Sequence, residues 1–226
     1  MIGIFIGISA VVALISLGQG LEEYIEEQFE VLGVDKIIIE SKTLGPPGSA
    51  TSKSLILTSK DLRIIKDTKG VENAAGILIK SGVVKFKQES EIAFTFGMNE
   101  EYLSIFEKLG NFEVIVGRDL TDKDRFKAVV GYNHAHGNIW EKPIQLRDTL
   151  EIEGHKFKII GIRGKIGNPF DDNSVSIQKA TLKEILAIND EESQILVKTE
   201  RGYNPEKVAE EIERRLRKSR DEKENQ

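Results

Sequence analysis

The apolar and polar positions divide the start of the chain into two contrasting segments. Residues 2–17 carry no charge and, apart from two serines, no polar side chain, whereas residues 18–33 are acidic and amphipathic. No proline or turn cluster separates the segments, so we expect one continuous helix. A membrane span needs about 17 to 25 predominantly apolar residues. The pattern therefore predicts a short or partial transmembrane helix over residues 1–18 and a stalk helix over residues 19–33.

Two other structures could explain the apolar segment. A signal peptide has a basic region before its apolar core and a small-residue cleavage site after it. This sequence has no Lys or Arg before Ile2 and no such site after Leu17. A buried core helix without a polar face is uncommon outside large proteins, so the membrane segment is the favoured interpretation.

A heptad pattern runs from the apolar segment into the acidic one. Its positions alternate steps of three and four residues, while glutamates fill the opposite face. The stripe is predicted to pack against another helix or the top of a domain. An ordinary surface helix would explain only its second half. The stripe consists of Leu14, Leu17, Leu21, Tyr24, Gln28 and Val31.

Beyond residue 33, short apolar runs alternate with turn residues. We expect a strand or a turn at residues 114–118 and hairpins around 88–91 and 153–154. We expect strands at residues 36–40, 76–79, 83–87, 92–97, 128–131, 150–152, 156–162, 175–177 and 193–199. We expect helices at residues 58–69, 100–109, 132–140 and 180–186, and from Pro205 onwards. Thr58 or Ser59 would cap the first helix and Asn204 the last. Residues 41–54 are a loop, and the charged tail from residue 217, with 219–226 as its end, is expected to fray. The expected core comprises Ile37, Ile38, Ile39, Leu62, Ile65, Val208 and Ile212, with Leu216 on the face of the last two.

Composition narrows the classes of function. The net charge of −5 and the pI of about 5.5 argue against nucleic acid as a partner, because nucleic-acid binding calls for a basic patch. The absence of cysteine excludes disulfides, zinc–thiolate sites and thiol catalysis. The 226 residues suffice for one large domain or two small ones beyond the membrane segment.

Candidate chemistry is sparse. His134 and His136 form an H-x-H and His155 is the third histidine, but a zinc site needs three or four converging ligands, so we predict surface polar residues. Asp171, Asp172 and Asn173 lack the spacing of a calcium loop and are predicted to form a solvated loop. Residues 161–167 are glycine-rich, but Ile166 follows Lys165 where a phosphate-binding loop has Ser or Thr. We therefore expect no catalytic, cofactor-binding or metal-ligating residue.

The order of motifs resembles that of the periplasmic core domain of MacB-type ABC transporter permeases, which are related to lipoprotein-releasing and FtsX-like permeases. The matching runs are IGISAVVALISLGQGLEEYIEEQFEVLGVDKIIIE, LTSKDLRIIKDTKGVENAAGI, FGMNEEYLSIF, VGRDLTDKD, AVVGY, LEIEGHKFKIIGI and DDNSVSIQKAT. Together they follow the family's order across nearly the whole chain.

The resemblance implies an α+β fold, with a membrane and stalk helix, a porter-like α/β subdomain and a second small α/β subdomain inserted into it. The porter-like part would be residues 34–97 and 191–218, and the insert residues 98–190. The final strand and helix repeat the pattern of residues 36–69, as a returning half should. The family has cytoplasmic residues before this region and three membrane helices after it, so we expect a piece of a longer protein or a truncated gene product. Residues 143–148 (PIQLRD) depart from the family's proline turn with Gly-Lys, which leaves that turn's geometry open.

The implied function is that of a non-catalytic permease subunit that couples cytoplasmic ATP hydrolysis to export or mechanical signalling outside the membrane. Its implied partners are an ABC ATPase on a separate chain or domain, a second permease bound through the membrane helices, the membrane itself, and an exported substrate or extracytoplasmic protein. The bulk of the chain would be extracytoplasmic at the cell membrane. The alternative is a membrane-anchored extracytoplasmic binding module that acts without an ATPase.

Overall fold

The computed structural model describes residues 3, 7–18, 35–40, 56–106, 112–137 and 139–220. Residues 7–18 form a helix whose side chains are all exposed. Among the described residues, no helix is both long enough and apolar enough to cross a membrane. The expected stalk at residues 19–33 and the loop at 41–54 lie outside the described residues, so the membrane and stalk helix remain a prediction.

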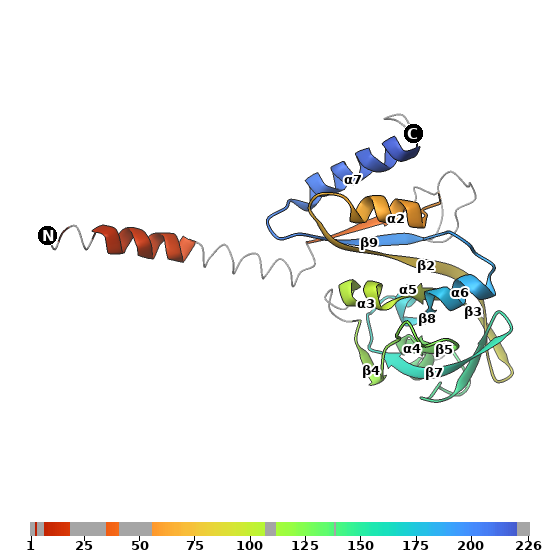
Figure 1. Ribbon diagram of the computed structural model, residues 1–226. Coiled ribbons are helices and arrows are strands. Elements are labelled where there is room, and N and C mark those ends of the chain that lie inside the picture. Colours follow the sequence, from red (N-terminus) through yellow and green to blue (C-terminus); the bar gives the residue numbers. More distant parts are fainter. Residues whose placement is uncertain are drawn as a thin grey trace.

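The rest of the described chain is a mixed α/β fold built around nine strands (Figure 1). The strands are β1 (Lys36–Glu40), β2 (Val71–Phe86), β3 (Glu89–Met98), β4 (Val114–Gly117), β5 (Lys127–Val130), β6 (Thr149–Ile152), β7 (His155–Arg163), β8 (Val175–Gln178) and β9 (Gln194–Thr199). The helices are α2 (Ser59–Lys66), α3 (Glu100–Phe106), α4 (Tyr132–His136), α5 (Pro169–Asp172), α6 (Lys179–Ile185) and α7 (Pro205–Arg220). Most expected elements are confirmed, with bounds shifted by a few residues.

The long strand β2 joins two groups of strands. Its first half pairs with β9, which in turn pairs with β1. Its second half pairs with β3 and β6. The expectation of separate strands at 76–79 and 83–87 was wrong, because Ser81 and Gly82 continue the ladder opposite Phe94 and Ala93.

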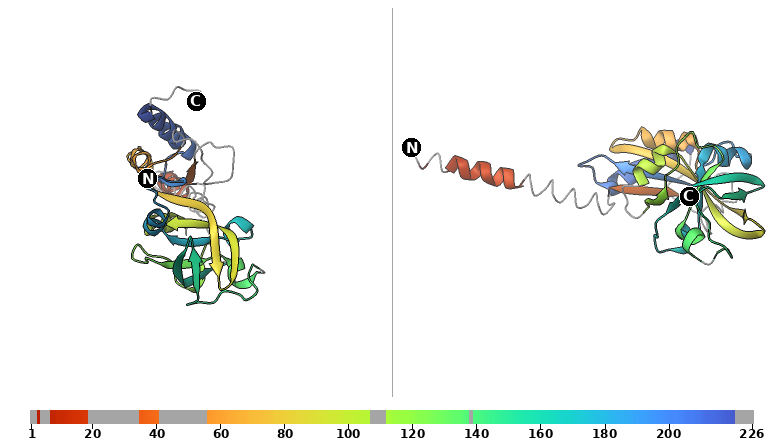
Figure 2. Two further views of the ribbon diagram at one scale, coloured as in Figure 1. Left: turned by 90° about the vertical axis from the view of Figure 1, so that its right-hand side faces the viewer. Right: turned by 90° about the horizontal axis from the view of Figure 1, so that it is seen from below.

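The strands of the second group close into a ring. Within the described residues, β2 pairs with β3, β3 with β8, β8 with β5, β5 with β7, β7 with β6, and β6 again with β2. A closed ring of strands leaves no free edge among its members. The left view of Figure 2 shows the yellow, green and teal strands of this group gathered below the helices α2 and α7. The ring takes β2 and β3 from residues 34–97 and its other strands from residues 98–190, so these two segments share one hydrogen-bonded structure.

Local sequence signals explain the turns and caps. Glu153 and Gly154 both have positive φ, 47° and 79°, as a two-residue type I′ hairpin requires, which confirms the hairpin between β6 and β7. The side chain of Thr58 caps α2 and forms a capping box with Asp61. The side chain of Asn204 accepts a hydrogen bond from the backbone N–H of Lys207 (3.2 Å) at the start of α7, as expected.

Part of the expected frayed tail is ordered instead. The helix α7 continues to Arg220, whose guanidinium lies 2.7 Å from the carboxylate of Asp61. This ion pair fixes the last turn of α7 against the first turn of α2, so the expectation that fraying begins at residue 217 was wrong. Residues 221–226 lie outside the described part of the chain.

Three clusters of buried apolar side chains form the core. One lies between the sheet β1–β9–β2 and the helices α2 and α7, and includes Ile65, Val208 and Ile212 as expected. Within β1, Ile37 and Ile39 pack against this cluster whereas Ile38 is 56% exposed. The expectation that Ile38 belongs to the core was therefore wrong, because β1 is an edge strand with one solvent-facing side.

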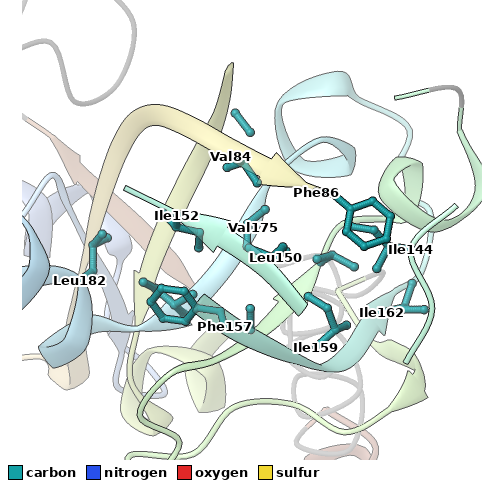
Figure 3. Close-up of a cluster of buried hydrophobic side chains, with 14 of the residues drawn as sticks. Val84, Phe86, Ile144, Leu150, Ile152, Phe157, Ile159, Ile162, Val175 and Leu182 are labelled. Atoms are coloured by element: carbon teal, nitrogen blue, oxygen red, sulfur yellow. The ribbon is translucent and has the colours of Figure 1, made fainter. Parts of the chain in front are cut away.

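The other two clusters lie on the opposite face of that sheet and inside the ring. The helix α3 covers Ala75 and Ile77 of β2 together with Leu196 of β9. The interior of the ring is filled by side chains from β2, β6, β7 and β8, among them Phe86, Leu150 and Phe157 (Figure 3). The helices α2 and α7 thus stand on one face of the first sheet, while α3 lies on the other face.

Candidate functional site

His134, predicted to be a surface residue, is buried, with 1% of its surface exposed. The indole Nε1 of Trp140 donates to its Nδ1 (3.0 Å), and its Nε2 lies 2.9 Å from the backbone carbonyl of Asn173. An indole N–H can only donate and a carbonyl can only accept, so the ring is neutral with its proton on Nε2. Burial lowers its pKa from 6.5 to about 4. The expectation was wrong because both partners become neighbours only in the fold.

The three histidines do not converge on one site. His134 and His136 lie two residues apart on the helix α4, so they do not share a face. The exposed ring of His136 stacks on Tyr132 with centroids 4.3 Å apart, and His155 is exposed at the start of β7. Among the described residues, no three histidine, aspartate or glutamate side chains are placed to hold a metal ion.

Asp172 is also buried, at 3% exposure, instead of lying in a solvated loop. Its carboxylate accepts hydrogen bonds from the backbone N–H groups of Ile166 (2.8 Å) and Gly167 (3.0 Å). The prediction of a solvated loop was therefore wrong for this residue. Since a carboxylate already occupies these amides, the glycine-rich segment 161–167 does not offer them to a phosphate.

Two aspartates of the VGRDLTDKD motif, Asp119 and Asp124, form structural ion pairs. The guanidinium of Arg163, 1% exposed, lies 2.8 Å from Asp119 and 3.8 Å above the ring of Phe112. Asp124 is buried between Arg118 and Lys127. The hydrogen bond from Arg118 lowers the pKa of Asp124 well below its ordinary value of 3.8, and Lys127 and Thr121 add to this.

One short segment between α6 and β9 makes polar contacts with several elements of the fold. We call residues 190–193, with the sequence DEES, the junction segment. Asp190 accepts a hydrogen bond from the backbone N–H of Ser59 (2.8 Å), the first residue of α2. The hydroxyl of Ser193 accepts from the backbone N–H of Ile79 (2.9 Å) and donates to its carbonyl (3.1 Å).

The two glutamates of the junction segment form ion pairs with lysines of β2 and α6. Glu191 forms an ion pair with Lys80 of β2. Glu192, whose side chain is 3% exposed, lies 3.1 Å from both Lys179 and Lys183 of α6. Burial lowers the pKa of Lys179, and the nearby carboxylate of Glu192 partly opposes that shift. The backbone N–H of Glu192 also donates to the carbonyl of Leu57 (2.8 Å).

Glycines let α6 and the junction segment approach the sheet closely. A Cβ at Gly76 would lie 2.3 Å from the Oε2 of Glu192, and one at Gly97 would lie 2.9 Å from Leu182 of α6. Lys179 donates to the carbonyl of Gly76 (2.7 Å). The helix α6, the strand β2 and the junction segment are therefore in direct polar and steric contact.

A small cavity beside this contact has a volume of about 20 Å³ and includes Lys80, Gly82 and Thr95 in its lining. Ligand sites usually have volumes of about 300–1,000 Å³, whereas a single water needs about 10–15 Å³. The cavity therefore has room for a water molecule.

Of the expected stalk stripe, the structure describes two members. Leu14 and Leu17 lie three residues apart on the helix at residues 7–18 and are 68% and 70% exposed. Leu21, Tyr24, Gln28 and Val31 lie outside the described residues, so the stripe remains a prediction. Sequence reasoning missed the junction segment; its one signal is a run of three acidic residues before a strand.

Comparison with known families gives a match along most of the chain. The family model described as the MacB-like periplasmic core domain matches residues 1–215. An uncharacterized ABC transporter permease, MJ1507 of Methanocaldococcus jannaschii, is 32% identical over 221 residues, which cover 97% of this chain and 54% of that protein. The macrolide export ATP-binding/permease protein MacB of Neisseria gonorrhoeae is 26% identical over 179 residues, 77% of this chain and 27% of that protein. This chain thus spans about half or less of the length of these relatives.

Solved structures share the fold. The crystal structure of the periplasmic region of MacB from Actinobacillus actinomycetemcomitans has a TM-score of 0.67 at 16% identity, and the similarity covers 87% of this chain and 89% of that one. The extracellular domain of the noncanonic ABC-type transporter YknZ from Gram-positive bacteria has a TM-score of 0.64 at 19% identity, and the similarity covers 84% and 96% of the two chains. At these identities the likeness concerns the fold.

Proposed function

Since the chain belongs to the MacB-like periplasmic core domain family, we propose that it is the extracytoplasmic part of an ABC transporter permease that couples cytoplasmic ATP hydrolysis to export or mechanical signalling. The observation that carries the proposal is the family match over residues 1–215. The exposed apolar helix at residues 7–18 supports an anchor in the membrane, since side chains of this kind are normally removed from water.

The proposed role is not catalytic. The polar clusters described above are all engaged in ion pairs or hydrogen bonds that hold the fold, and no metal-binding group occurs among the described residues. ATP hydrolysis would then belong to an ABC ATPase on a separate chain or domain. The further partners that we propose are a second copy of the permease and an exported substrate or extracytoplasmic protein. Nucleic acid is not among them.

The arrangement of the described residues suits the transmission of movement. The strand β1 follows the expected stalk directly, and it pairs with β9 in the sheet that carries α2 and α7. The hydroxyl and the backbone N–H of Thr199 in β9 both donate to the carbonyl of Asp35 (2.9 Å each), immediately before β1. Movement that enters through the stalk would therefore act on one packed unit.

The test uses the full-length permease, reconstituted in vesicles with its ATPase. We expect Leu21→Glu, which places a charge in the predicted stripe outside the described residues, to lower ATPase activity or transport. The same change should move the melting temperature of the present chain by only a few degrees, since surface substitutions cost within about 0.5 kcal/mol. Glu23→Gln, on the opposite face of the predicted stalk, is the control.

Two outcomes would contradict the proposal. A permease that purifies and functions without any ATPase would favour the alternative of a membrane-anchored binding module. Unfolding of the present chain by Leu21→Glu would place the stalk in the core and remove its role in coupling. As a separate check, calorimetry of the chain with ATP and magnesium should give no heat above dilution.

A further inference from the structure

We propose that the junction segment transmits movement between the pair α2–α7 and the helix α6, with Glu192 as the residue that holds α6 to it. The inference deepens the proposed function, because it names a route by which a displacement would pass through the domain. It depends on contacts at both ends of the junction segment and on the fact that, in the part of the chain that the structure describes, the helices belong to separate apolar clusters.

The first end of the route lies at the contact between α7 and α2. Arg220, in the last turn of α7, donates to Asp61 of α2 (2.7 Å) and to the carbonyl of Ile56 (3.0 Å). Asp61 is 3% exposed and also accepts from the hydroxyl and the backbone N–H of Thr58 (2.8 Å each). A displacement of the end of α7 therefore acts directly on the cap of α2.

The residue after the cap of α2 forms hydrogen bonds with the junction segment. Ser59 follows Thr58, and its backbone N–H and hydroxyl both donate to Asp190. Asp190 is exposed, so water can replace its hydrogen bonds if the side chain is removed. This makes Asp190 a link that can be cut without leaving a buried group unsatisfied.

The second end of the route lies at α6. The carboxylate of Glu192 is held between Lys179 and Lys183 at 3.1 Å from each, and Lys179 also binds the carbonyl of Gly76. Removal of one partner from a buried ion pair is costly because it leaves an uncompensated charge. The three charges therefore keep α6 in one position relative to the junction segment.

Packing alone does not join these helices. The apolar faces of α2 and α7 belong to the cluster with Ile65 and Val208, whereas α6 contributes Leu182 to the interior of the ring. The two clusters share no residue among those described. The junction segment makes polar contacts with both groups, through its side chains and through the backbone N–H of Glu192, which donates to the carbonyl of Leu57 beside the cap of α2 (2.8 Å). It is therefore the direct link that we assign.

Hydrogen exchange on the whole chain tests the route. We expect Arg220→Gln to raise the exchange rates of α6 amides about tenfold relative to those of β7, as a local opening would. In the Asp190→Ala background the same substitution should raise the exchange rates of the α6 amides by clearly less than tenfold. The side-chain link to Ser59 is then cut, and the backbone hydrogen bond from Glu192 to Leu57 still joins the junction segment to the residue before the cap. Arg220→Lys, which keeps the charge, should restore much of the protection.

A matched control removes an exposed ion pair outside the route. Glu72 pairs with Lys198 between β2 and β9 (2.7 Å) and does not contact the junction segment. In the Glu72→Ala background, Arg220→Gln should still raise the exchange of α6. The proposal is overturned if Arg220→Gln leaves the exchange rates of the α6 amides unchanged, or if it raises them as much in the Asp190→Ala background as in the parent chain. It is also overturned if the α6 and β7 amides change by the same factor, since that would indicate a general loss of stability. Because the measurement needs neither a membrane nor an ATPase, its failure would leave the proposed permease function standing.

Discussion

The carboxylate of Glu192 occupies the space that a side chain at position 76 would fill. A Cβ at Gly76 would lie 2.3 Å from its Oε2 and 2.6 Å from its Cδ, far inside van der Waals contact. The carboxylate cannot simply swing away, because it forms ion pairs with Lys179 and Lys183, each at 3.1 Å. A glycine inside a strand usually weakens the strand. Here the close approach of the Glu192 ion pair explains why position 76 is a glycine.

Gly76→Ala should therefore destabilise the chain by about 1–3 kcal/mol, the usual cost of overpacking. Urea unfolding followed by the fluorescence of Trp140, the only tryptophan of the sequence, measures the change. Ser81→Ala, at an exposed position of the same strand, should have little effect. The cost of Gly76→Ala should also fall in a Glu192→Ala background, and equal costs in both backgrounds would contradict this account.

The burial of His134 makes stability depend on pH in a defined window. Because its pKa is lowered from 6.5 to about 4, the unfolded chain binds more protons than the folded chain between these values. This contribution is fully present above pH 6.5 and is lost as the pH falls towards 4, by about 3 kcal/mol in total.

His134→Gln should flatten the dependence of unfolding free energy on pH between 4 and 6.5. Glutamine can still donate to the carbonyl of Asn173 and accept from Trp140, so the variant is expected to fold. His155→Gln, at an exposed position, is the control and should keep the slope. An unchanged slope in His134→Gln would show that protonation of His134 does not drive the loss of stability.

Features that depend on short stretches of sequence could be predicted. The hairpin at Glu153 and Gly154, the cap at Thr58 and the apolar face of α7 were all expected, because turn chemistry and periodicity act over a few residues. The family was also recognised from the order of its motifs, and the match over residues 1–215 confirms it.

Features that depend on partners far along the chain were missed. His134 is paired with Asn173, and Arg163 with Asp119, across 39 and 44 residues. Polar residues are mostly exposed unless a partner accompanies them into the core, and the sequence alone does not reveal that partner. The closure of the strand ring by β6 was missed for the same reason, since β6 pairs with β2 over a distant stretch of chain.

Asp124 should contribute to the loss of stability in acid. Arg118 holds its pKa well below 3.8, so its contribution is present above that value and is lost as the pH falls through its lowered pKa. Asp124→Asn should therefore be less stable than the parent chain at pH 7, and the difference should shrink below pH 3.8. Acid titrations of unfolding compare the two chains, with Glu213→Gln on the exposed face of α7 as control. A difference that stays constant down to pH 2 would exclude this role for Asp124.

Removing only the carboxylate of the ion pair between Arg163 and Asp119 should cost at least as much stability as replacing both residues. Asp119→Asn removes the carboxylate that pairs with the buried guanidinium, which is 1% exposed, and we expect a loss of about 3–5 kcal/mol. Replacing both residues, with Arg163→Met and Asp119→Asn together, removes the buried charge as well, so the double variant should be at least as stable as Asp119→Asn alone. Glu184→Gln, which breaks the exposed pair with Arg125, should cost less than about 1 kcal/mol. Urea unfolding compares the stability of the parent chain, Asp119→Asn, the double variant and Glu184→Gln. A double variant less stable than Asp119→Asn would mean that Arg163 stabilises the fold mainly through the ring of Phe112 rather than through its ion pair.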